Sequence, residues 1–170
     1  MKNYTIAELN SLSREEFVRI IGPVFEHSAW IAELTWPQRP FSSVEGLHQS
    51  LCATMRGADE EKQLVLIRAH PDLVGRAAQV GTLTAPSTRE QASAGLDQLT
   101  PEEIALFQNY NQAYQSKFGF PFIICARLNK KEAILAGFEQ RLKNSRAREL
   151  EIALQEIEKI ASLRLHDVAK

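Results

Sequence analysis

The sequence predicts an all-α fold: a single compact multi-helix domain over residues 1–170, with one extended apolar segment near Phe120–Ala126. Apolar residues recur at three- or four-residue spacing along most of the chain, which is the stripe of an amphipathic helix. Hydroxyl and acidic residues three positions apart mark several helix starts. A chain of 170 residues is long enough for one domain with its own hydrophobic core.

Three helices are predicted to begin with a capping box, in which a hydroxyl and an acid bind each other's backbone N–H groups. The pairs are Ser13 with Glu16, Ser42 with Glu45, and Thr100 with Glu103. The apolar stripes that follow them are Phe17, Ile20 and Ile21; Leu47, Leu51 and Met55; and Ile104, Phe107, Tyr110 and Tyr114. Pro101 supports the third start, because proline suits the first helical position.

The remaining helices are predicted from single caps and stripes. Asp59 is a candidate N-cap for a helix through Ala69, with Leu64 and Ile67 facing the core. Gly119 and Pro121 end the helix that starts at Thr100. Two C-terminal helices follow, separated near Asn144-Ser145. Their stripes are Ile134, Leu135, Phe138 and Leu142, and then Leu150, Ala153, Leu154, Ile157, Ile160 and Ala161.

Two segments depart from the helical pattern. Phe120–Ala126 is continuously apolar and follows a glycine, so periodicity allows either a buried strand or the start of a buried helix. A lone strand would have no partner in a helical chain, and we therefore expect an extended entry into a helix. Val74–Pro86 carries the weakest helical signal, with Gly75 and Gly81 inside it, and is expected to contain a mobile loop.

Composition excludes several classes of function. The formal net charge is −1 and no basic run is present, which argues against a nucleic-acid partner. No apolar run is long enough to span a membrane. Cys52 and Cys125 lie far apart without metal-binding spacing, which favours free thiols in a reducing, cytoplasmic compartment. The polar N-terminus lacks a signal-peptide pattern, and Val168-Ala169-Lys170 is not a peroxisomal signal.

The most informative stretch runs from Ile67 to Leu73 and contains His70 followed by Pro71. The proline disfavours helical geometry at the histidine, so the imidazole is expected at a helix terminus. An imidazole titrates near neutrality and is suited to acid–base catalysis there. Taken alone, His70 is better explained as a polar residue at a helix end than as a catalyst. His27, His48 and His166 have no comparable surroundings and are interpreted as structural.

A second candidate stretch runs from Ser87 to Gln91. Ser87 and Glu90 have the spacing of a fourth capping box, and from this motif alone a structural cap is the favoured interpretation. The same helix start would present free N–H groups to an anion or a polarised carbonyl. Glu90 would add an acid–base group, and Gln91 an amide suited to a urea-like ligand.

A third candidate is Phe122–Ala126 with the following Arg127. The segment is either part of the core or an apolar wall whose backbone hydrogen-bonds a polar ligand. Arg127 is a candidate partner for Glu90 or for a substrate carboxylate. Cys125 is a weak candidate nucleophile, because no activating group lies near it in the sequence. A fourth stretch, Phe25–Trp30 with Arg39-Pro40-Phe41, is interpreted as structural packing or a dimer contact.

Together these stretches resemble one known family, the 2-oxo-4-hydroxy-4-carboxy-5-ureidoimidazoline (OHCU) decarboxylases. The resemblance covers nearly the whole chain, and the motifs occur in the family's order. They are Phe25–Trp30, Arg39–Phe41, Ala69–Leu73, Ser87–Leu96 and Phe118–Arg127. Ala29 departs from the pattern, because many relatives have proline at that position.

The resemblance implies an all-α, usually dimeric enzyme that forms (S)-allantoin and carbon dioxide in the last step of urate degradation. It implies no metal and no organic cofactor. Its catalytic histidine corresponds to His70, with Glu90 orienting that ring or handling the substrate's hydroxyl proton. The positions that correspond to substrate contacts are Pro71, Ser87, Thr88, Arg89, Glu90, Gln91, Phe122, Ile123, Ile124, Cys125 and Ala126. By this resemblance, His70 would act either as acid to an intermediate or as base to the hydroxyl.

Three alternatives remain at the level of sequence. The chain could be a non-catalytic helical interaction module whose binding face lies near Trp30. It could be a different enzyme, either a hydrolase that depends on histidine and glutamate or a cysteine-based transferase. A third possibility keeps the fold and changes the substrate to another ureidoimidazoline-like acid. A pocket that joins His70, Glu90 and Phe122 would argue against the first.

Overall fold

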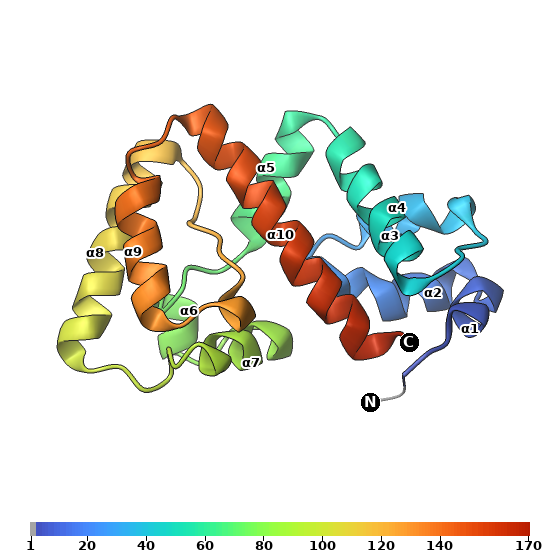
Figure 1. Cartoon of the computed structure of the whole chain (residues 1–170), viewed down its shortest axis with the longest axis horizontal. Helices are drawn as coiled ribbons and strands as arrows, with labels where there is room; N and C mark the ends of the chain where they lie inside the picture. The colour runs from blue at the N-terminus through green and yellow to red at the C-terminus, as the bar shows by residue number, and fades with distance from the viewer. Residues whose placement is uncertain (1–2) are drawn as a thin grey trace. The chain divides into compact units, whose positions relative to one another are not determined.

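Helices account for all the regular structure in the computed structural model, which describes residues 3–170 without the side chain of Ala77. Within that part of the chain there is no β-strand, and Tyr4 forms only one isolated parallel bridge, with Ala169. The predicted all-α class is therefore confirmed (Figure 1). The helices are α1 (Ile6–Ser11), α2 (Arg14–Ile21), α3 (Trp30–Thr35), α4 (Val44–Gly57), α5 (Glu60–Ala69), α6 (Arg76–Gln79), α7 (Ala85–Ser93), α8 (Pro101–Phe118), α9 (Lys131–Arg141) and α10 (Arg146–Val168), with 3-10 turns η1 (Gly22–Val24), η2 (Trp36–Gln38) and η3 (Ala126–Leu128).

The chain divides into two compact units. Unit 1 comprises residues 3–69 with Glu158–Lys170, and unit 2 comprises His70–Ile157. Helix α10 contributes its first part to unit 2 and its last part to unit 1. The expectation of one domain over residues 1–170 stays a prediction. None of the helices in residues 3–170 is long and apolar enough to cross a membrane.

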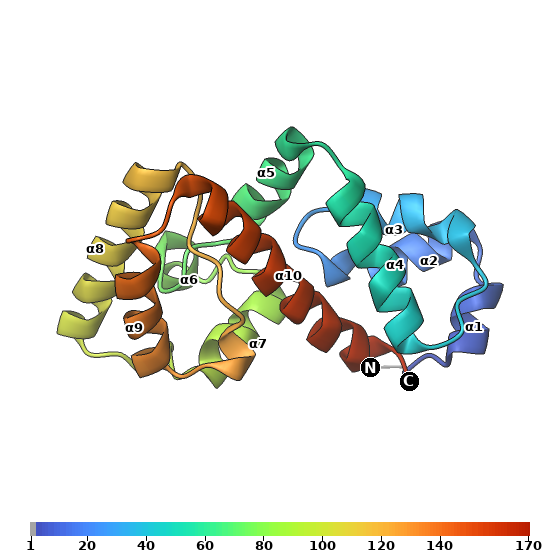
Figure 2. The same cartoon turned by 45° about the horizontal axis from the view of Figure 1, so that its top comes forward.

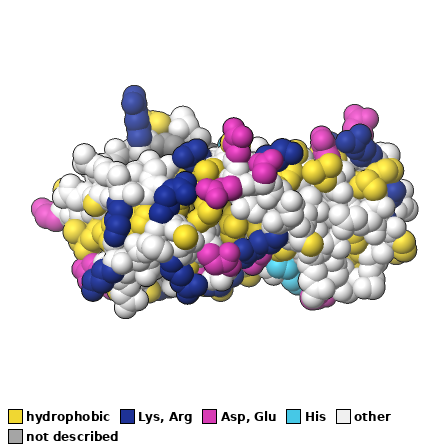
Figure 3. Space-filling view, turned by 90° about the horizontal axis from the view of Figure 1, so that it is seen from above, with side chains coloured by type: hydrophobic (Ala, Val, Ile, Leu, Met, Phe, Trp, Pro, Cys, Tyr) yellow, Lys and Arg dark blue, Asp and Glu magenta, His cyan; other side chains and the backbone are white. Residues whose placement is uncertain are grey.

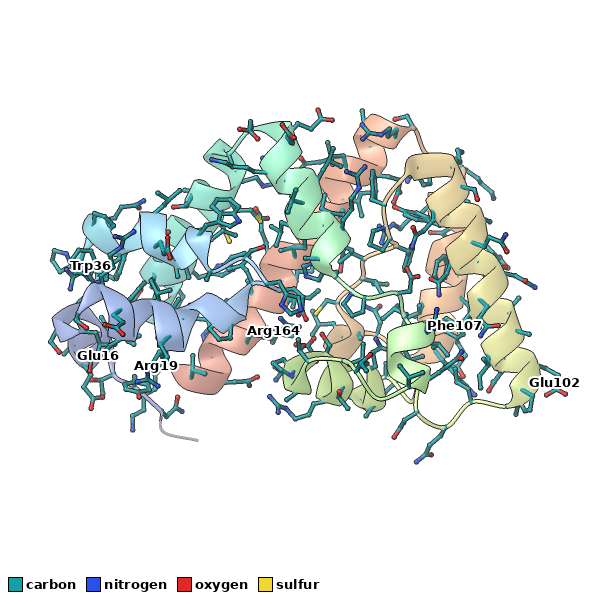
Figure 4. All side chains as sticks on the ribbon, turned by 180° about the vertical axis from the view of Figure 1, so that it is seen from behind. Glu16, Arg19, Trp36, Glu102, Phe107 and Arg164 are labelled. Atoms are coloured by element: carbon teal, nitrogen blue, oxygen red, sulfur yellow. The ribbon has the colours of Figure 1, made fainter. Side chains whose placement is uncertain are left out.

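Unit 1 is built around α3, which packs against α2 and α4. Its fully buried side chains include Leu9, Phe17, Ile21, Ile31, Leu47 and Leu51. Phe17 stacks on Phe41, and the buried Arg164 of α10, marked in Figure 4, donates to Glu26 Oε2 at 2.8 Å. The stretch near Phe25–Trp30 thus contributes to the packing of this unit.

Unit 2 places α8 and α9 side by side, as both ribbon views show (Figures 1 and 2). Phe107, labelled on α8 in Figure 4, meets Phe138 of α9 edge to face, with ring centroids 6.2 Å apart. Tyr114 and Phe122 pack in the same aromatic cluster. Through Phe122, the third candidate stretch is part of this aromatic core.

Several predicted helix starts are confirmed. Both Ser13 and Thr100 form complete capping boxes. Asp59 Oδ1 accepts the N–H of Lys62 at 2.8 Å, as expected of the cap of α5. Gly119 ends α8 with φ +79°, a conformation that glycine adopts without strain.

Other boundaries were predicted wrongly. The cap of α4 is Ser43 rather than Ser42, and Ser43 Oγ accepts the N–H of Gly46 at 3.0 Å. The cap of α7 is Thr84 rather than Ser87, because the helix begins at Ala85 with Pro86 in its first turn. A proline there loses no hydrogen bond, so the helix can start before it.

Two expectations about burial and loops were also only partly right. Within Val74–Pro86 the chain forms the short helix α6 and the first residues of α7, with a loop over residues 80–84 between them, and the mobility of that loop stays a prediction. On α5, Leu66 is fully buried with Ile67, whereas the predicted Leu64 is half-buried.

Charged side chains are mixed in sign on the face drawn in Figure 3, where Lys and Arg alternate with Asp and Glu. This pattern agrees with the net charge of −1. It gives that face no extended basic area of the kind that phosphate contacts require.

Candidate active site

His70 is the first residue after α5, and the prediction that a helix ends immediately before it is confirmed. Only 8% of its surface is exposed. Pro71 and Asp72, which follow it, are half-buried. The candidate catalytic imidazole is thus a mostly buried group at the start of unit 2.

A tight turn follows the histidine. The N–H of Gly75 donates to Asp72 O at 3.2 Å, and Val74 has a φ of +54°. A Cβ at position 75 would lie 2.7 Å from Asp72 Cβ, so the turn requires glycine there. A β-branched residue rarely adopts positive φ, which makes Val74 a strained position close to His70.

Carboxamide side chains from two helices bind this turn. Asn111 Nδ2 of α8 donates to Leu73 O at 2.8 Å, and Gln91 Oε1 of α7 accepts the N–H of Val74 at 3.1 Å. Gln115 Nε2 of α8 donates to both carboxylate oxygens of Asp72, at 2.9 and 3.1 Å. The turn next to His70 is therefore fixed mainly by neutral donors and acceptors.

Helix α7 carries the second candidate stretch. Ser87 and Gln91 lie four residues apart on its buried face, at 5% and 7% exposure. Thr88 and Arg89 are exposed, and Glu90 is half-buried. Because Thr84 caps this helix, the structural explanation of Ser87 and Glu90 as a capping box is wrong.

The third candidate stretch is extended up to Cys125 and leads into η3, which begins at Ala126, and then into α9; an extended entry into a helix is as predicted. Its backbone is held largely by charged side chains. Arg141 donates to Ile123 O at 2.6 Å, and Glu156 Oε2 accepts the N–H of Cys125 at 2.8 Å. Asn129 Nδ2 donates to Cys125 O at 2.9 Å.

The side chains of this segment are mostly part of the core. Phe122 is 1% exposed and stacks on Phe138 at a centroid distance of 3.8 Å, with the Arg141 guanidinium 4.1 Å from its ring. Ile123, Cys125 and Ala126 are also buried, and Ile124 is half-buried. The structural interpretation of the segment is thus correct for its side chains.

The electrostatics of the segment disfavour a thiolate. Burial raises the pKa of the Cys125 thiol, and the carboxylates of Glu156 and Glu90 raise it further. Burial likewise raises the pKa of Cys52 to about 12. Both cysteines are free, and neither has the lowered pKa that marks a nucleophilic cysteine.

Helix α7 links the candidate stretches within unit 2. Gln91 contacts the turn after His70, while the helix packs against η3 at the end of the extended segment. The charge on Glu90 is close enough to Cys125 to influence its pKa. Lys130 Nζ also donates to Ser93 O at 2.8 Å. Arg127 is exposed, and its predicted pairing stays a prediction.

Sequence reasoning missed the residues that support these stretches. Asn111 occupies an apolar register of α8, between Phe107 and Tyr114, and a polar residue in that register was an available signal. Arg141 and Glu156 are buried charges on long helices, and their partners lie too far along the chain to be inferred from spacing.

A surface pocket of about 700 Å³ also lies in unit 2, between the α6 region and α8. Asp72 lines it together with Asn111 and Gln115, but none of the predicted substrate contacts does. Within residues 3–170, no group of three or more His, Cys, Asp or Glu side chains is placed to hold a metal ion.

Comparison with known proteins agrees with the resemblance. The OHCU decarboxylase family model matches residues 10–166. A Halalkalicoccus jeotgali 2-oxo-4-hydroxy-4-carboxy-5-ureidoimidazoline decarboxylase is 43% identical over 99% of this chain and 93% of its own length. A Haloferax volcanii protein of the same name is 41% identical, over 97% and 96%. The crystal structure of an (S)-allantoin synthase matches 95% of this chain and 52% of its own, with a TM-score of 0.76 and 28% identity. The chain therefore belongs to the OHCU decarboxylase family.

Proposed function

We propose that this chain decarboxylates 2-oxo-4-hydroxy-4-carboxy-5-ureidoimidazoline to (S)-allantoin, with His70 as the group that transfers the proton. The observation that carries the proposal is the arrangement of His70, α7 and Phe122–Ala126 within one unit of a chain from this family. The solved relative named an (S)-allantoin synthase supports the choice of product.

The substrate's chemistry explains how amino-acid side chains suffice. Its carboxylate leaves from a carbon that also bears a hydroxyl and adjoins a C=N bond. As the bond to carbon dioxide breaks, its electron pair forms the C=C bond of an ene-type intermediate, and the π pair of the C=N bond moves onto nitrogen, which takes up a proton from solvent. A proton then adds to the neighbouring carbon on one face, while the hydroxyl gives up its own proton to a base and becomes a carbonyl. The substrate itself accepts the electrons, so the proposal includes no metal or cofactor.

His70 is assigned the proton transfer because it is a mostly buried imidazole fixed at a helix terminus. It acts either as acid toward the intermediate or as base toward the hydroxyl. Glu90, half-buried on α7, orients the imidazole or takes the hydroxyl proton. Pro71, next to the imidazole, contacts the substrate at the edge of the site.

The remaining contacts bind the ureido and carbonyl groups of the substrate. Ser87–Gln91 contributes one set of these contacts. Gln91 already uses its Oε1 on Val74, and its Nε2 lies 3.5 Å from Asp72 O. We therefore assign the second Nε2 proton to a substrate carbonyl. The N–H of Cys125 is bound to Glu156, so substrate bonds fall to other peptide groups of Phe122–Ala126.

The test is turnover of OHCU generated in place from urate, with circular dichroism to follow the appearance of one allantoin enantiomer. His70→Gln should lower the catalysed rate by roughly two to four orders of magnitude and leave the melting temperature close to wild type. His48, which contacts Glu158 O at 2.9 Å in unit 1, provides the matched control His48→Gln. Unchanged stereospecific turnover by His70→Gln would remove this residue from the mechanism.

The same assay separates the alternatives. A cysteine-based enzyme would lose activity on thiol alkylation, whereas the raised pKa of both cysteines favours retention of activity. An interaction module would not accelerate formation of (S)-allantoin at all.

We further propose a homodimer in the cytoplasm. The two free cysteines are compatible with a reducing compartment. Sedimentation that gives twice the mass of one chain would support the dimer, and a single-chain mass would contradict it.

A further inference from the structure

One peptide group in the turn after His70 is hydrogen-bonded by two side chains, one at its carbonyl and one at its N–H. The carbonyl of Leu73 and the N–H of Val74 belong to the same peptide unit. Asn111 of α8 donates to that carbonyl at 2.8 Å, and Gln91 of α7 accepts that N–H at 3.1 Å. Rotation of this peptide plane would break both bonds at once. Two helices thus fix the orientation of a single peptide, three residues after the candidate catalytic histidine.

These two hydrogen bonds are needed because the conformation is strained and the Leu73–Val74 peptide is buried. Val74 has a φ of +54°, which β-branched residues rarely adopt. Leu73 and Val74 are 7% and 4% exposed, so water is poorly placed to replace a lost bond. Such a conformation persists only where the surrounding contacts over-determine it.

Asn111 is a poor choice for stability at this position. It is 6% exposed and sits between core residues of α8, and its Oδ1 has no hydrogen-bond partner among the described residues. A buried unpaired acceptor is unfavourable, and an apolar side chain would avoid it. The presence of an amide at this position is therefore explained by the hydrogen bond that its Nδ2 donates to Leu73 O.

We infer that Asn111 is a positioning residue: through the Leu73–Val74 peptide it holds the strained turn that sets the place of His70. The inference rests on the proposed function of His70. Gln91 makes the second hydrogen bond to this peptide, but it is also a proposed substrate contact. The test therefore uses Asn111 and Val74 only.

Asn111→Leu removes the donor together with the unpaired oxygen. The expected result is a fall in kcat of roughly 10- to 100-fold with little change in KM, because a displacement of about 1 Å at a catalytic group has an effect of this size. Asn109→Leu is the matched control, because Asn109 is an exposed residue of the same helix. Loss of melting temperature with an unchanged kcat would overturn the inference and leave Asn111 a structural residue.

Val74→Gly gives a rescue test, because glycine adopts positive φ without strain. In the Val74→Gly background, Asn111→Leu should lower kcat less than it does beside the native valine. An equal loss in both backgrounds would contradict the role of the strained turn. Should Asn111→Leu fail to fold, Asn111→Ser replaces it, since a serine hydroxyl is too short to reach Leu73 O.

A readout independent of turnover separates this inference from the proposed function. The ring C–H signal of His70 in NMR spectra is assigned by its loss in His70→Gln. Asn111→Leu should shift that signal, and the added Val74→Gly should move it back. If Asn111→Leu shifts the signal but the wild-type protein does not turn over OHCU, only the proposed reaction is overturned. An unshifted signal would overturn the positioning role.

Discussion

The two sides of the candidate site are held in different ways. The turn Asp72–Gly75 is bound through its backbone by the carboxamides of Asn111 and Gln91, which carry no charge. The segment Phe122–Ala126 is bound through its backbone by the side chains of Arg141 and Glu156.

The difference indicates which of the two segments can change its geometry while unit 2 stays folded. A net hydrogen bond between neutral groups contributes about 1 kcal/mol, and losing one partner of a buried pair costs about 1–3 kcal/mol. Removing one partner of a buried ion pair costs about 3–5 kcal/mol, because the remaining charge stays buried. The segment is therefore the fixed side of the site. The turn is the side whose geometry can change without unfolding unit 2.

We call Phe122–Ala126, whose backbone is bound by charged side chains, the charged side of the site, and the turn Asp72–Gly75 the neutral side. The largest expected effect is on the charged side. Arg141 donates to Glu149 Oε2 at 2.9 Å as well as to Ile123 O, and Glu149 is completely buried. Arg141→Met keeps much of the volume and leaves that carboxylate without its cation. The free energy of unfolding should fall by about 3–5 kcal/mol, as measured by urea denaturation.

Arg148→Met is the matched control for this variant, because Arg148 is an exposed arginine of α10. Its effect should stay within about 0.5 kcal/mol. A loss below about 1 kcal/mol in Arg141→Met would show that Glu149 is stabilised well enough by Tyr114 and Asn144, which also donate to it.

Much of the fold was predictable because local signals agree with one another. The helix from Thr100 has a capping box at its start, a proline in its first turn and a glycine after its end. Prediction failed where two hydroxyl residues competed. Ser42 and Ser43 are adjacent candidates for the cap of α4, and spacing alone could not choose between them.

Less of the candidate site was predictable. The stretch around His70 and the extended segment were identified from the sequence, whereas the side chains that fix them were not. Asn111 is hydrogen-bonded to Leu73, which lies 38 positions earlier in the sequence, and Glu156 to Cys125, which lies 31 positions earlier. Contacts at that separation depend on how helices pack, which periodicity does not encode.

Removal of the N-cap of α7, the helix that contacts both sides of the site, should have a smaller effect on stability. Thr84 Oγ1 accepts the N–H of Ser87, so Thr84→Ala should lower the free energy of unfolding by about 1 kcal/mol. Thr88→Ala, at an exposed position of the same helix, should change it by less than about 0.5 kcal/mol. Equal losses in the two variants would mean that capping does not determine where this helix starts.

The smallest expected effect is a pH dependence on the charged side alone. Burial, with the charges of Glu156 and Glu90, raises the pKa of Cys125 above its ordinary value of 9.0. As the pH rises past that value, the unfolded chain loses the thiol proton while the folded chain keeps it. The unfolded state then binds fewer protons, so stability falls with increasing pH.

Cys125→Ser should make this fall shallower, as measured by urea denaturation between about pH 8 and about pH 10. Both proteins should carry Cys52→Ser, because the pKa of that thiol is also raised, to about 12. Asn111→Leu, on the neutral side, should keep the slope of its parent, because it changes no titratable group. A slope that Asn111→Leu alters and Cys125→Ser does not would reverse the assignment of the two sides.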